Sequence, residues 1–547
     1  METKTDFTVK NIKTDVLIIG AGGAGARAAV EAAQTGRQVT LVCRAPLGQG
    51  GLTPTANGGY QAAVLPGDSP AIHAEDLIAA GSGLNDRPLV EALTGEALEQ
   101  ARILEQFGAR MNWEIPKKVH EPQMRYPRSI FVPGKEILAA LRRQLKKYGN
   151  VLLLEDYLSL QLLLHDGKVV GALLFNIKEG SITVCESKTT ILATGSLGEI
   201  YPLSAQEPMG IPTGSTGSGY VLAGMAGADL VDMEMIQFSI VPLLPPLIKG
   251  MRCLPWASLR NSRGNDFLPP NAEEYSHETA QALYRELRQG QVTMDLHDRK
   301  APDHARHPLA GRRNRQLQEL EVTPYQRRVA VGLGALFMMG GVHISERCET
   351  SVPGLYAAGE VAGNVHGARR VAGNAFPEMI VFGARAGKYA AEEAGGKGSF
   401  PEAPKQQIGE CRERLSGIME GKHHDITPVE LREKTRAIMG KHAHAIRTGT
   451  GLQTALEELR ALESDLPFVM VKTEGGFRYN ASLLETIDLH WLLAVSRIVC
   501  RAALLRQESR GFQFREDFPE EREDWLKHTL VRRAGGEWVG GTKTIAR

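Results

Sequence analysis

The chain has 547 residues, of which 42% are hydrophobic, which is enough for several domains with ordinary buried cores. Its 64 basic and 63 acidic side chains leave a net charge of +1, so the composition gives no reason to expect a nucleic acid or an anionic membrane as a partner. The apolar stretch FSIVPLLPPLI is broken by prolines and is much shorter than the roughly 20 residues of a membrane span. Any membrane attachment would therefore need another subunit.

The N-terminus and the cysteines favour a cytoplasmic protein. METKTDFTVK is polar and lacks the apolar core of a secretory signal. The six cysteines are scattered, with no CxxC pair and no zinc-type spacing to histidines, which predicts no metal site and no iron–sulfur cluster of the chain's own. Isolated cysteines without an export signal are typical of a reducing compartment.

The first predicted element is a complete β-α-β unit. Residues 15–20 form a short β-branched run typical of a buried parallel strand, an alanine-rich helix ends at Gly36, and residues 38–43 form the second strand. The loop GAGGAG at 20–25 fits GxGxxG. Its first glycine permits the tight turn, its second lets the backbone approach a pyrophosphate at the helix N-terminus, and its third allows the helix to pack on the strand.

The second strand ends in Cys43 and Arg44 instead of the acidic residue that often holds a ribose hydroxyl in NAD-binding proteins. The glycine motif alone therefore leaves FAD and NAD open, although NAD is less favoured. More than 300 residues later, the strand 354–359 is followed by a glycine turn and Glu360, which suits a second wall around the ribityl chain of FAD. We expect Glu360 to accept a ribityl or ribose hydroxyl.

The elements between and after these two segments complete an α/β chain. Residues 151–195 predict a β-meander with turns at Asp166-Gly167 and Glu179-Gly180, while prolines and arginines interrupt the strand–helix pattern from about 240 to 345. The expected fold is a Rossmann-like bipartite FAD-binding domain with an inserted capping domain and a C-terminal helical region. The predicted divisions are a first FAD-binding segment at 1–240, a capping or substrate domain at 241–345, a second FAD-binding segment at 346–400, a helical domain at 401–510 and a C-terminal extension at 511–547.

Several motifs together resemble the fumarate reductase/succinate dehydrogenase flavoprotein family. They are GAGGAG, ANGG at 56–59, ATGS at 193–196, MMGG at 338–341, LYAAGE at 355–360, HGARRVAGNA at 366–375, ESRGFQFREDFPE at 508–520 and DWLKHTL at 524–530. The resemblance implies bound FAD and electron exchange with an iron–sulfur subunit. The covalent flavin histidine of the respiratory members corresponds to Leu52, so we expect the FAD to be non-covalent.

The motifs and the resemblance together predict the cofactor-binding residues. Asn374 and Ala375 are expected to open a helix whose amides stabilise negative charge at flavin N1 and O2. The full predicted set is Gly20, Gly22, Gly23, Ala24, Gly25, Cys43, Arg44, Gly51, Thr53, Asn57, Gly58, Gly59, Ala193, Thr194, Gly195, Gly359, Glu360, Asn374 and Ala375.

The predicted substrate site departs from the respiratory dicarboxylate enzymes. The resemblance places Ser239 and Leu336, the latter followed by Phe337, where the family has two substrate histidines. Arg370 matches the family's substrate arginine, with Arg369 beside it. The remaining predicted residues are Arg252 and His366 as catalytic groups, and Pro242, Leu243 and Trp256 as apolar neighbours. One guanidinium and an apolar wall suit a small substrate with one anionic end.

These features predict hydride transfer between flavin N5 and a carbon of an anionic organic substrate, as C=C reduction or the reverse dehydrogenation. Three alternatives stay open: an oxidase like L-aspartate oxidase, a flavoprotein like that of adenylylsulfate reductase, and an electron relay with a degenerate pocket. The histidines of the charged helical region are expected to be solvated and to bind no metal; they are His423, His424, His442 and His444.

Overall fold

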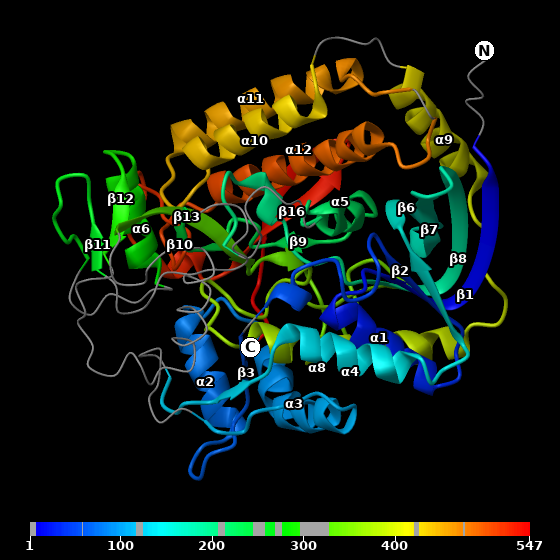
Figure 1. The fold of residues 1–547 in the computed structure, drawn as a ribbon, viewed down its shortest axis with the longest axis horizontal. Coiled ribbons are helices and arrows are strands. Elements are labelled where there is room, and N and C mark those ends of the chain that lie inside the picture. Colours follow the sequence, from blue (N-terminus) through cyan, green and yellow to red (C-terminus); the bar gives the residue numbers. More distant parts are fainter. Residues whose placement is uncertain are drawn as a thin grey trace.

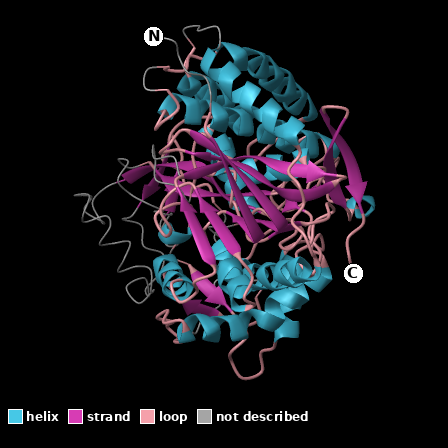
Figure 2. Ribbon diagram, turned by 90° about the vertical axis from the view of Figure 1, so that its right-hand side faces the viewer, coloured by secondary structure: helices cyan, strands magenta, loops and turns pink. Residues whose placement is uncertain are grey.

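The structure is a computed structural model that describes residues 7–56, 58–115, 124–205, 214–243, 258–268, 276–295, 328–420, 426–473 and 476–547. Strands run through the middle of the molecule, and helices cover them on both sides (Figure 2). The predicted residues Asn57, Arg252, Trp256, His423 and His424 lie outside the described residues.

The central sheet has seven strands. In chain order they are β1 (Val9–Ile19), β2 (Val39–Cys43), β5 (Val151–Glu155), β6 (Tyr157–His165), β7 (Lys168–Asn176), β8 (Ser181–Leu192) and β15 (Leu355–Ala357). Strands β5, β2, β1 and β8 are parallel neighbours in that order, and β15 adds to the outer side of β8. The first strand begins at Val9, earlier than predicted, because its polar half pairs with the outer half of β8.

The predicted β-meander is confirmed. β6, β7 and β8 are antiparallel neighbours, and the two short turns fall at the predicted positions. Asp166 and Gly167 both have positive φ, at 48° and 72°, as a tight hairpin requires.

Helices on one face of the sheet carry the N-terminal and central segments of the chain. They are α1 (Gly23–Gln34), α2 (Pro70–Ala80), α3 (Arg87–Gln106), α4 (Gly134–Leu145) and α8 (Ala375–Gly396). α8 packs against α1 and α3, and α4 packs against α1 (Figure 1). The small sheet of β3 (Gly59–Gln61) and β4 (Ser129–Phe131) lies beside them.

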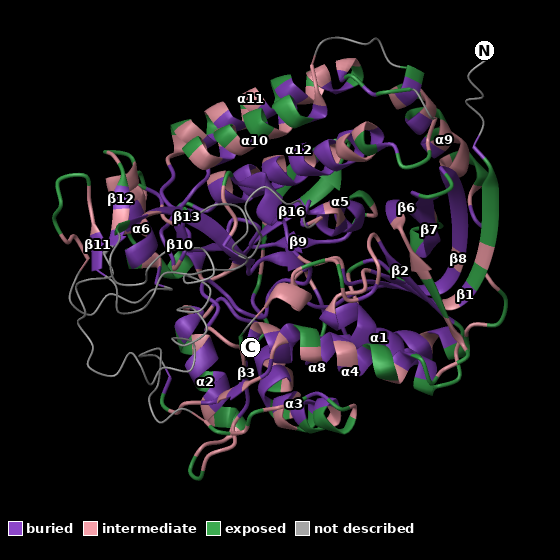
Figure 3. Cartoon of the chain, viewed as in Figure 1, coloured by how far each residue is buried: buried purple, intermediate pink, exposed green. Residues whose placement is uncertain are grey.

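The other side of the molecule carries the predicted C-terminal helices. They are α9 (Lys405–Glu420), α10 (Pro428–His442), α11 (Gly449–Asp465) and α12 (Ala481–Leu505), with α5 (Ser218–Met225) beneath them. α12 is largely buried between α10, α11 and the body of the molecule (Figure 3). No helix in the described ranges is both long and apolar enough to cross a membrane.

A four-stranded antiparallel sheet occupies much of the region where the sequence predicted no regular alternation. Its strands are β10 (Ile236–Pro242), β13 (Arg328–Met338), β12 (Val292–Asp295) and β11 (Ser258–Arg260), and α6 (His277–Leu287) packs against it. The strands pair across long sequence separations, which a local pattern does not reveal. The domain boundaries stay a prediction.

A third sheet pairs strands near the C-terminus with strands from the middle of the sequence. It consists of β14 (Gly341–Val342), β9 (Leu230–Val231), β16 (His528–Ala534) and β17 (Glu537–Lys543). Short 3-10 helices complete the described elements, at Thr53–Thr55, Gly198–Ile200, Leu466–Phe468 and Glu523–Trp525.

The prediction for His444 is wrong. Its ring is buried between Phe238 and Tyr284, with ring centroids 4.3 and 4.8 Å away, instead of facing solvent. The aromatic contacts come from β10 and α6, so they depend on tertiary packing. No group of metal ligands is present in the described ranges.

Buried charges fasten the C-terminal segment to the rest of the fold. Arg506 is fully buried, and its guanidinium binds Glu234 at 2.6 Å, Glu508 at 2.8 Å and Asp232 at 3.0 Å. His528, also buried, lies between Asp232 at 2.5 Å and Asp86 at 3.2 Å. Each carboxylate is compensated only while the basic partners stay in place, because water does not reach them.

We expect Arg506→Ala to destabilise the protein by about 3–5 kcal/mol, because it leaves Glu234 buried without its cation and removes one of the basic partners of Asp232 and Glu508. Urea unfolding followed by circular dichroism would measure the loss. Arg532→Ala is the control, since Arg532 is half-exposed in its pair with Asp229 and should cost about 1 kcal/mol or less. Equal losses for the two variants would contradict the role of the buried network.

A second prediction concerns alkaline pH. The two carboxylates raise the pKa of His528 from 6.5 to about 10 against the opposing effect of burial. The charged ring therefore contributes stability that is fully present below pH 6.5 and is lost as pH rises through 10. The free energy of unfolding of wild type should fall over this range more steeply than that of His528→Asn. Parallel pH profiles for the two proteins would refute this assignment.

Candidate functional site

The glycine loop and the distant Gly359 turn meet at the ends of the paired strands. Gly20 follows β1 with φ +105°, and a Cβ there would lie 2.2 Å from the carbonyl oxygen of Ala193, which follows β8. Gly359 follows β15 with φ +74°, and a Cβ there would lie 2.8 Å from Cβ of Ala24. Side chains at either position would push the two segments apart.

The start of α1 has the geometry of a phosphate-binding turn. A Cβ at Gly25 would lie 1.8 Å from the carbonyl oxygen of Gly20, so only glycine lets the helix approach the strand. Gly22 is the N-cap, and the Gly23 amide donates to the Thr53 hydroxyl at 3.1 Å. The first-turn amides and the helix dipole favour an anion at this end.

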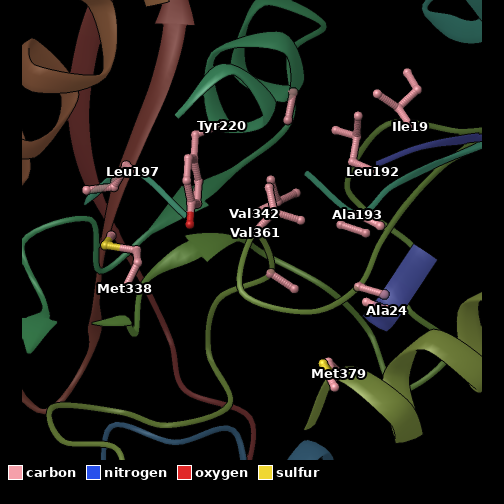
Figure 4. Packing of buried hydrophobic residues seen from close by; sticks show 14 of the residues in the cluster. Ile19, Ala24, Leu192, Ala193, Leu197, Tyr220, Met338, Val342, Val361 and Met379 are labelled. Atoms are coloured by element: carbon pink, nitrogen blue, oxygen red, sulfur yellow. The ribbon is translucent and has the colours of Figure 1, made fainter. Parts of the chain in front are cut away.

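Apolar side chains surround this junction. Figure 4 shows Ile19, Leu192 and Ala193 at the strand ends, Ala24 of α1 and Met379 of α8 close by, and Leu197 beside Met338. Of the other predicted cofactor residues, Gly51 and Gly195 have positive φ. Thr194 directly precedes Gly195, and Gly58 precedes Gly59, the first residue of β3.

Arg44, which follows β2, has a protein partner in the structure. Its guanidinium forms a two-bond ion pair with Asp488 of α12, at 2.6 and 2.7 Å, so it fastens α12 to the sheet. Burial raises the pKa of Cys43 to about 12, which keeps this thiol protonated. Glu155 is the register partner of Cys43, so a carboxylate lies beside the end of β2, and it accepts a bond from the Leu47 amide at 2.8 Å. The sequence pattern missed it because only strand pairing places it there.

Glu360 connects the turn after β15 to β13. Its carboxylate accepts a hydrogen bond from the Met338 amide at 2.9 Å, and its carbonyl oxygen accepts one from the Tyr220 hydroxyl at 2.8 Å. Burial raises the pKa of Glu360 to about 7, with a bond to Ser196 acting in the opposite direction. A hydroxyl-bearing ligand here would meet a carboxyl group that can either accept or donate.

A cavity lies between this junction and the antiparallel sheet. Its lining residues are Leu52, Ser196, Leu197, Gly198, Ser204, Ile236, Ala335, Leu336, Phe337 and Met338. The lining is mostly apolar, and it brings the predicted substrate residues Leu336 and Phe337 next to Leu52. Residues of the predicted FAD-binding segments and of the sheet that contains β10 and β13 therefore form the cavity together.

Arg370 lies against this apolar wall. Its guanidinium carbon is 4.5 Å from the centroid of the Phe337 ring, which is a cation–π contact, and the His366 ring is 5.4 Å from the same ring. His366 Nε2 is 4.0 Å from a carboxylate oxygen of Glu378, and all these residues are buried. Arg369 is buried beside them.

Burial shifts the pKa values of His366 and Glu378 in opposite directions. It lowers the pKa of His366 to about 3, with Arg370 acting in the same direction, so the ring stays neutral. It raises the pKa of Glu378 to about 8, against the effect of Arg370. Near neutral pH the arginines therefore carry the positive charge. Glu378 was missed by sequence reasoning, although a carboxylate within the buried run NAFPEMIVFG was a usable signal.

Several buried polar atoms of the elements around this region have no hydrogen-bond partner within the described ranges. They include Asn374 Oδ1 at the N-cap of α8, His366 Nε2 and the Ser239 hydroxyl on β10. Such atoms are normally hydrogen-bonded. Together with the glycine contacts, they fit a polar dinucleotide cofactor and a substrate that would supply the missing partners. Ala375 opens α8, whose amides lie at the same end.

Comparisons with known proteins agree with this geometry. Residues 15–376 match the family described as FAD binding domain, and residues 432–540 match the fumarate reductase flavoprotein C-terminal family. The chain is 32% identical to a fumarate reductase (CoM/CoB) subunit of Methanothermobacter marburgensis over 95% of this chain and 97% of that protein. It is 28% identical to L-aspartate oxidase of a Nostoc species over 95% and 93%.

The fold is also similar to that of Sdh1 from Mycobacterium smegmatis, solved in complex with UQ1. The TM-score is 0.88 and the identity 28%, over 98% of this chain and 95% of that chain. The predicted fold class is confirmed by these matches.

The presence of Leu52 at this position predicts that the flavin is not covalently attached there. Its side chain has no nucleophile and lines the cavity, so trichloroacetic acid should release all the flavin into the supernatant. Absorbance of the washed pellet and the supernatant would measure this, with a covalent flavoprotein as the positive control. A pellet that stayed yellow would show a covalent link elsewhere.

Proposed function

Because the chain belongs to the fumarate reductase/succinate dehydrogenase flavoprotein family and uses FAD as its cofactor, we propose that it exchanges a hydride with an activated C=C bond of a monoanionic substrate. The observation that carries the proposal is the Arg370 guanidinium lying against Phe337, at the edge of a cavity lined by apolar side chains. The reaction is C=C reduction or the reverse dehydrogenation.

The charge pattern favours one anionic end. Arg370 can bind a carboxylate through two parallel hydrogen bonds, with Arg369 next to it. The cavity beside Arg370 is lined by apolar residues such as Leu336 and Phe337, where a second carboxylate would lose hydration without gaining a charged partner. The Ser239 hydroxyl can donate one bond but carries no charge. The proposed substrate therefore has one carboxylate and an apolar remainder.

The chain's own groups hold and polarise the substrate. FAD supplies the hydride exchange when it is bound. The first amides of α8, after its N-cap Asn374, carry the positive end of the helix dipole and would stabilise negative charge on the cofactor ring. Neutral His366 and the mostly protonated Glu378 add no full negative charge beside the guanidinium of Arg370.

We infer that the electron partner is an iron–sulfur protein. One relative is named as a subunit of a fumarate reductase, which supports a role in a complex. We place the chain in the cytoplasm, with any attachment to a membrane made through such partners. The proposal predicts that native purification yields a second polypeptide that contains an iron–sulfur cluster.

An oxidase is a second candidate, favoured by the similarity to L-aspartate oxidase. It differs in needing no electron-transfer partner, because oxygen would reoxidise the flavin. Aerobic turnover of L-aspartate with hydrogen peroxide release would support it. Anaerobic turnover with reduced viologen, together with no peroxide release in air, would support the first proposal.

The proposed anion site is tested by ligand titration followed through flavin absorbance. Crotonate and cinnamate should perturb the spectrum of the FAD-loaded protein at lower concentrations than fumarate does. Arg370→Gln should weaken crotonate binding about 10- to 100-fold, the range for a lost hydrogen bond to a charged group. Arg347→Gln is the control, because Arg347 is half-exposed on Tyr389.

Two outcomes would contradict the proposal. Preference for fumarate over crotonate would show that a second carboxylate is recognised. The absence of any spectral change with all three acids would indicate an electron relay with a degenerate pocket.

A further inference from the structure

His277 opens α6 above the sheet that carries the substrate wall. Its N-cap, Ser276, accepts a hydrogen bond from the Thr279 amide, which fixes the start of the helix. α6 packs against β10 and β13, the strands of Ser239 and Phe337. α6 therefore packs on the sheet that carries the proposed substrate wall.

A second contact ties His277 to the arginine turn. Its ring lies 6.1 Å from the ring of Phe512 in an edge contact, and the Phe512 amide donates to the carbonyl oxygen of Ala368 at 3.2 Å. Arg369 is the next residue, and it lies close enough to His277 to lower the pKa of the imidazole. Phe512 therefore contacts both His277 and the turn that carries Arg369 and Arg370, the proposed anion-binding arginines.

The two nitrogens of His277 have different surroundings. Nε2 is 3.1 Å from a carboxylate oxygen of Glu278, whose side chain is 65% exposed. Nδ1 is buried and has no hydrogen-bond partner among the residues that the structure describes. A proton shared between Nε2 and Glu278 leaves the lone pair of the neutral ring on Nδ1, inside the protein. The ring thus links an exposed carboxylate to a buried acceptor.

We propose that His277 is the group that exchanges a proton with the substrate, through Nδ1, and that Glu278 is its positioning residue. The assignment rests on the proposed function, because it needs a carbon that accepts or loses a proton beside the carbon that exchanges the hydride. It concerns a residue that the sequence motifs did not single out.

Proton and hydride add to neighbouring carbons of the substrate. In reduction, the C=C pair forms the new C–H bond with the proton from Nδ1, while the other carbon receives the hydride. The N–H bonding pair stays on Nδ1, so the ring becomes neutral and keeps its other proton on Nε2 beside Glu278. Nδ1 takes up a new proton from water once the product has left. The substrate gains two electrons and the cofactor loses two. Dehydrogenation follows the reverse path.

The other described groups near the site are less suited to this task. His366 has a pKa of about 3 because of burial and Arg370, and it has no exposed partner among the described residues. Arginine keeps its proton in ordinary protein environments. The pKa of His277 is lowered too, mainly by burial and also by Arg369, but Glu278 acts in the opposite direction. The ring can therefore be both charged and neutral in the working cycle.

The experiment compares His277→Gln, Glu278→Gln and wild type as FAD-loaded full chains. Crotonate reduction with reduced viologen gives kcat and KM, and flavin absorbance gives the crotonate Kd between about pH 5.5 and 8.5, a range that spans the ordinary histidine pKa. His165→Gln is the matched control, because His165 lies half-exposed in the β6–β7 turn. Melting temperatures and flavin content establish that each variant folds and holds FAD.

We expect His277→Gln to lower kcat about 100-fold or more, as the loss of a general acid does, with KM within about threefold of wild type. A bound carboxylate favours the charged ring, so crotonate should bind wild type more tightly as pH falls. This dependence should weaken in His277→Gln, where Glu378, with its pKa raised by burial to about 8, still titrates beside Arg370. Glu278→Gln should shift the kcat profile to lower pH, because the ring loses the carboxylate that favours its charge.

The outcomes separate this inference from the proposed function. If crotonate binds and turns over in wild type but His277→Gln keeps kcat within about threefold, the proton assignment is wrong and the proposed function stands. If the pH dependence of the crotonate Kd is the same in His277→Gln as in wild type, the assignment is likewise wrong. If no acid perturbs the wild-type flavin or turns over, the proposed function fails and this inference fails with it.

Discussion

The parallel pairing of β8 with both β1 and β15 is the constraint on which the site depends. It places the Gly20 loop and the Gly359 turn at the same edge of one sheet, although more than 300 residues separate them. The edge is crowded enough that a Cβ at Gly20, Gly25 or Gly359 would collide with the neighbouring segment. A dinucleotide can be held there because backbone amides, not side chains, form the inner surface.

The second sheet turns this nucleotide edge into a reaction site. β13 brings Phe337 against His366 and Arg370, and the same low-dielectric surroundings act in opposite directions on acids and bases. Burial keeps His366 neutral and raises the pKa of Glu378, so the site presents guanidinium charge within an apolar wall. We propose that this combination discriminates substrates by the number of their carboxylates, because each extra charge needs its own partner.

The C-terminal segment stabilises this arrangement from behind. Arg506 and His528 bind carboxylates of the loop after β9, and His528 also reaches Asp86 at the start of α3. Arg44 makes a comparable link between the end of β2 and α12. These ion pairs join segments of the chain that are far apart in sequence, so they hold the FAD edge, the inserted sheet and the helical region in one geometry.

The sequence by itself determined the local features of this protein. GxGxxG after a buried run, the hairpin glycines of the meander and the AAGE turn follow from backbone conformations that few residue types allow, and they were sufficient to predict the FAD-binding fold. Only the tertiary structure decided which polar groups face one another. Glu155 beside Cys43, Arg44 with Asp488, buried His444 and His277 beside Arg369 all depend on strand register or helix docking between distant segments. Side-chain pairing across such distances leaves no periodic trace in the chain, because it is set by packing and not by local propensity.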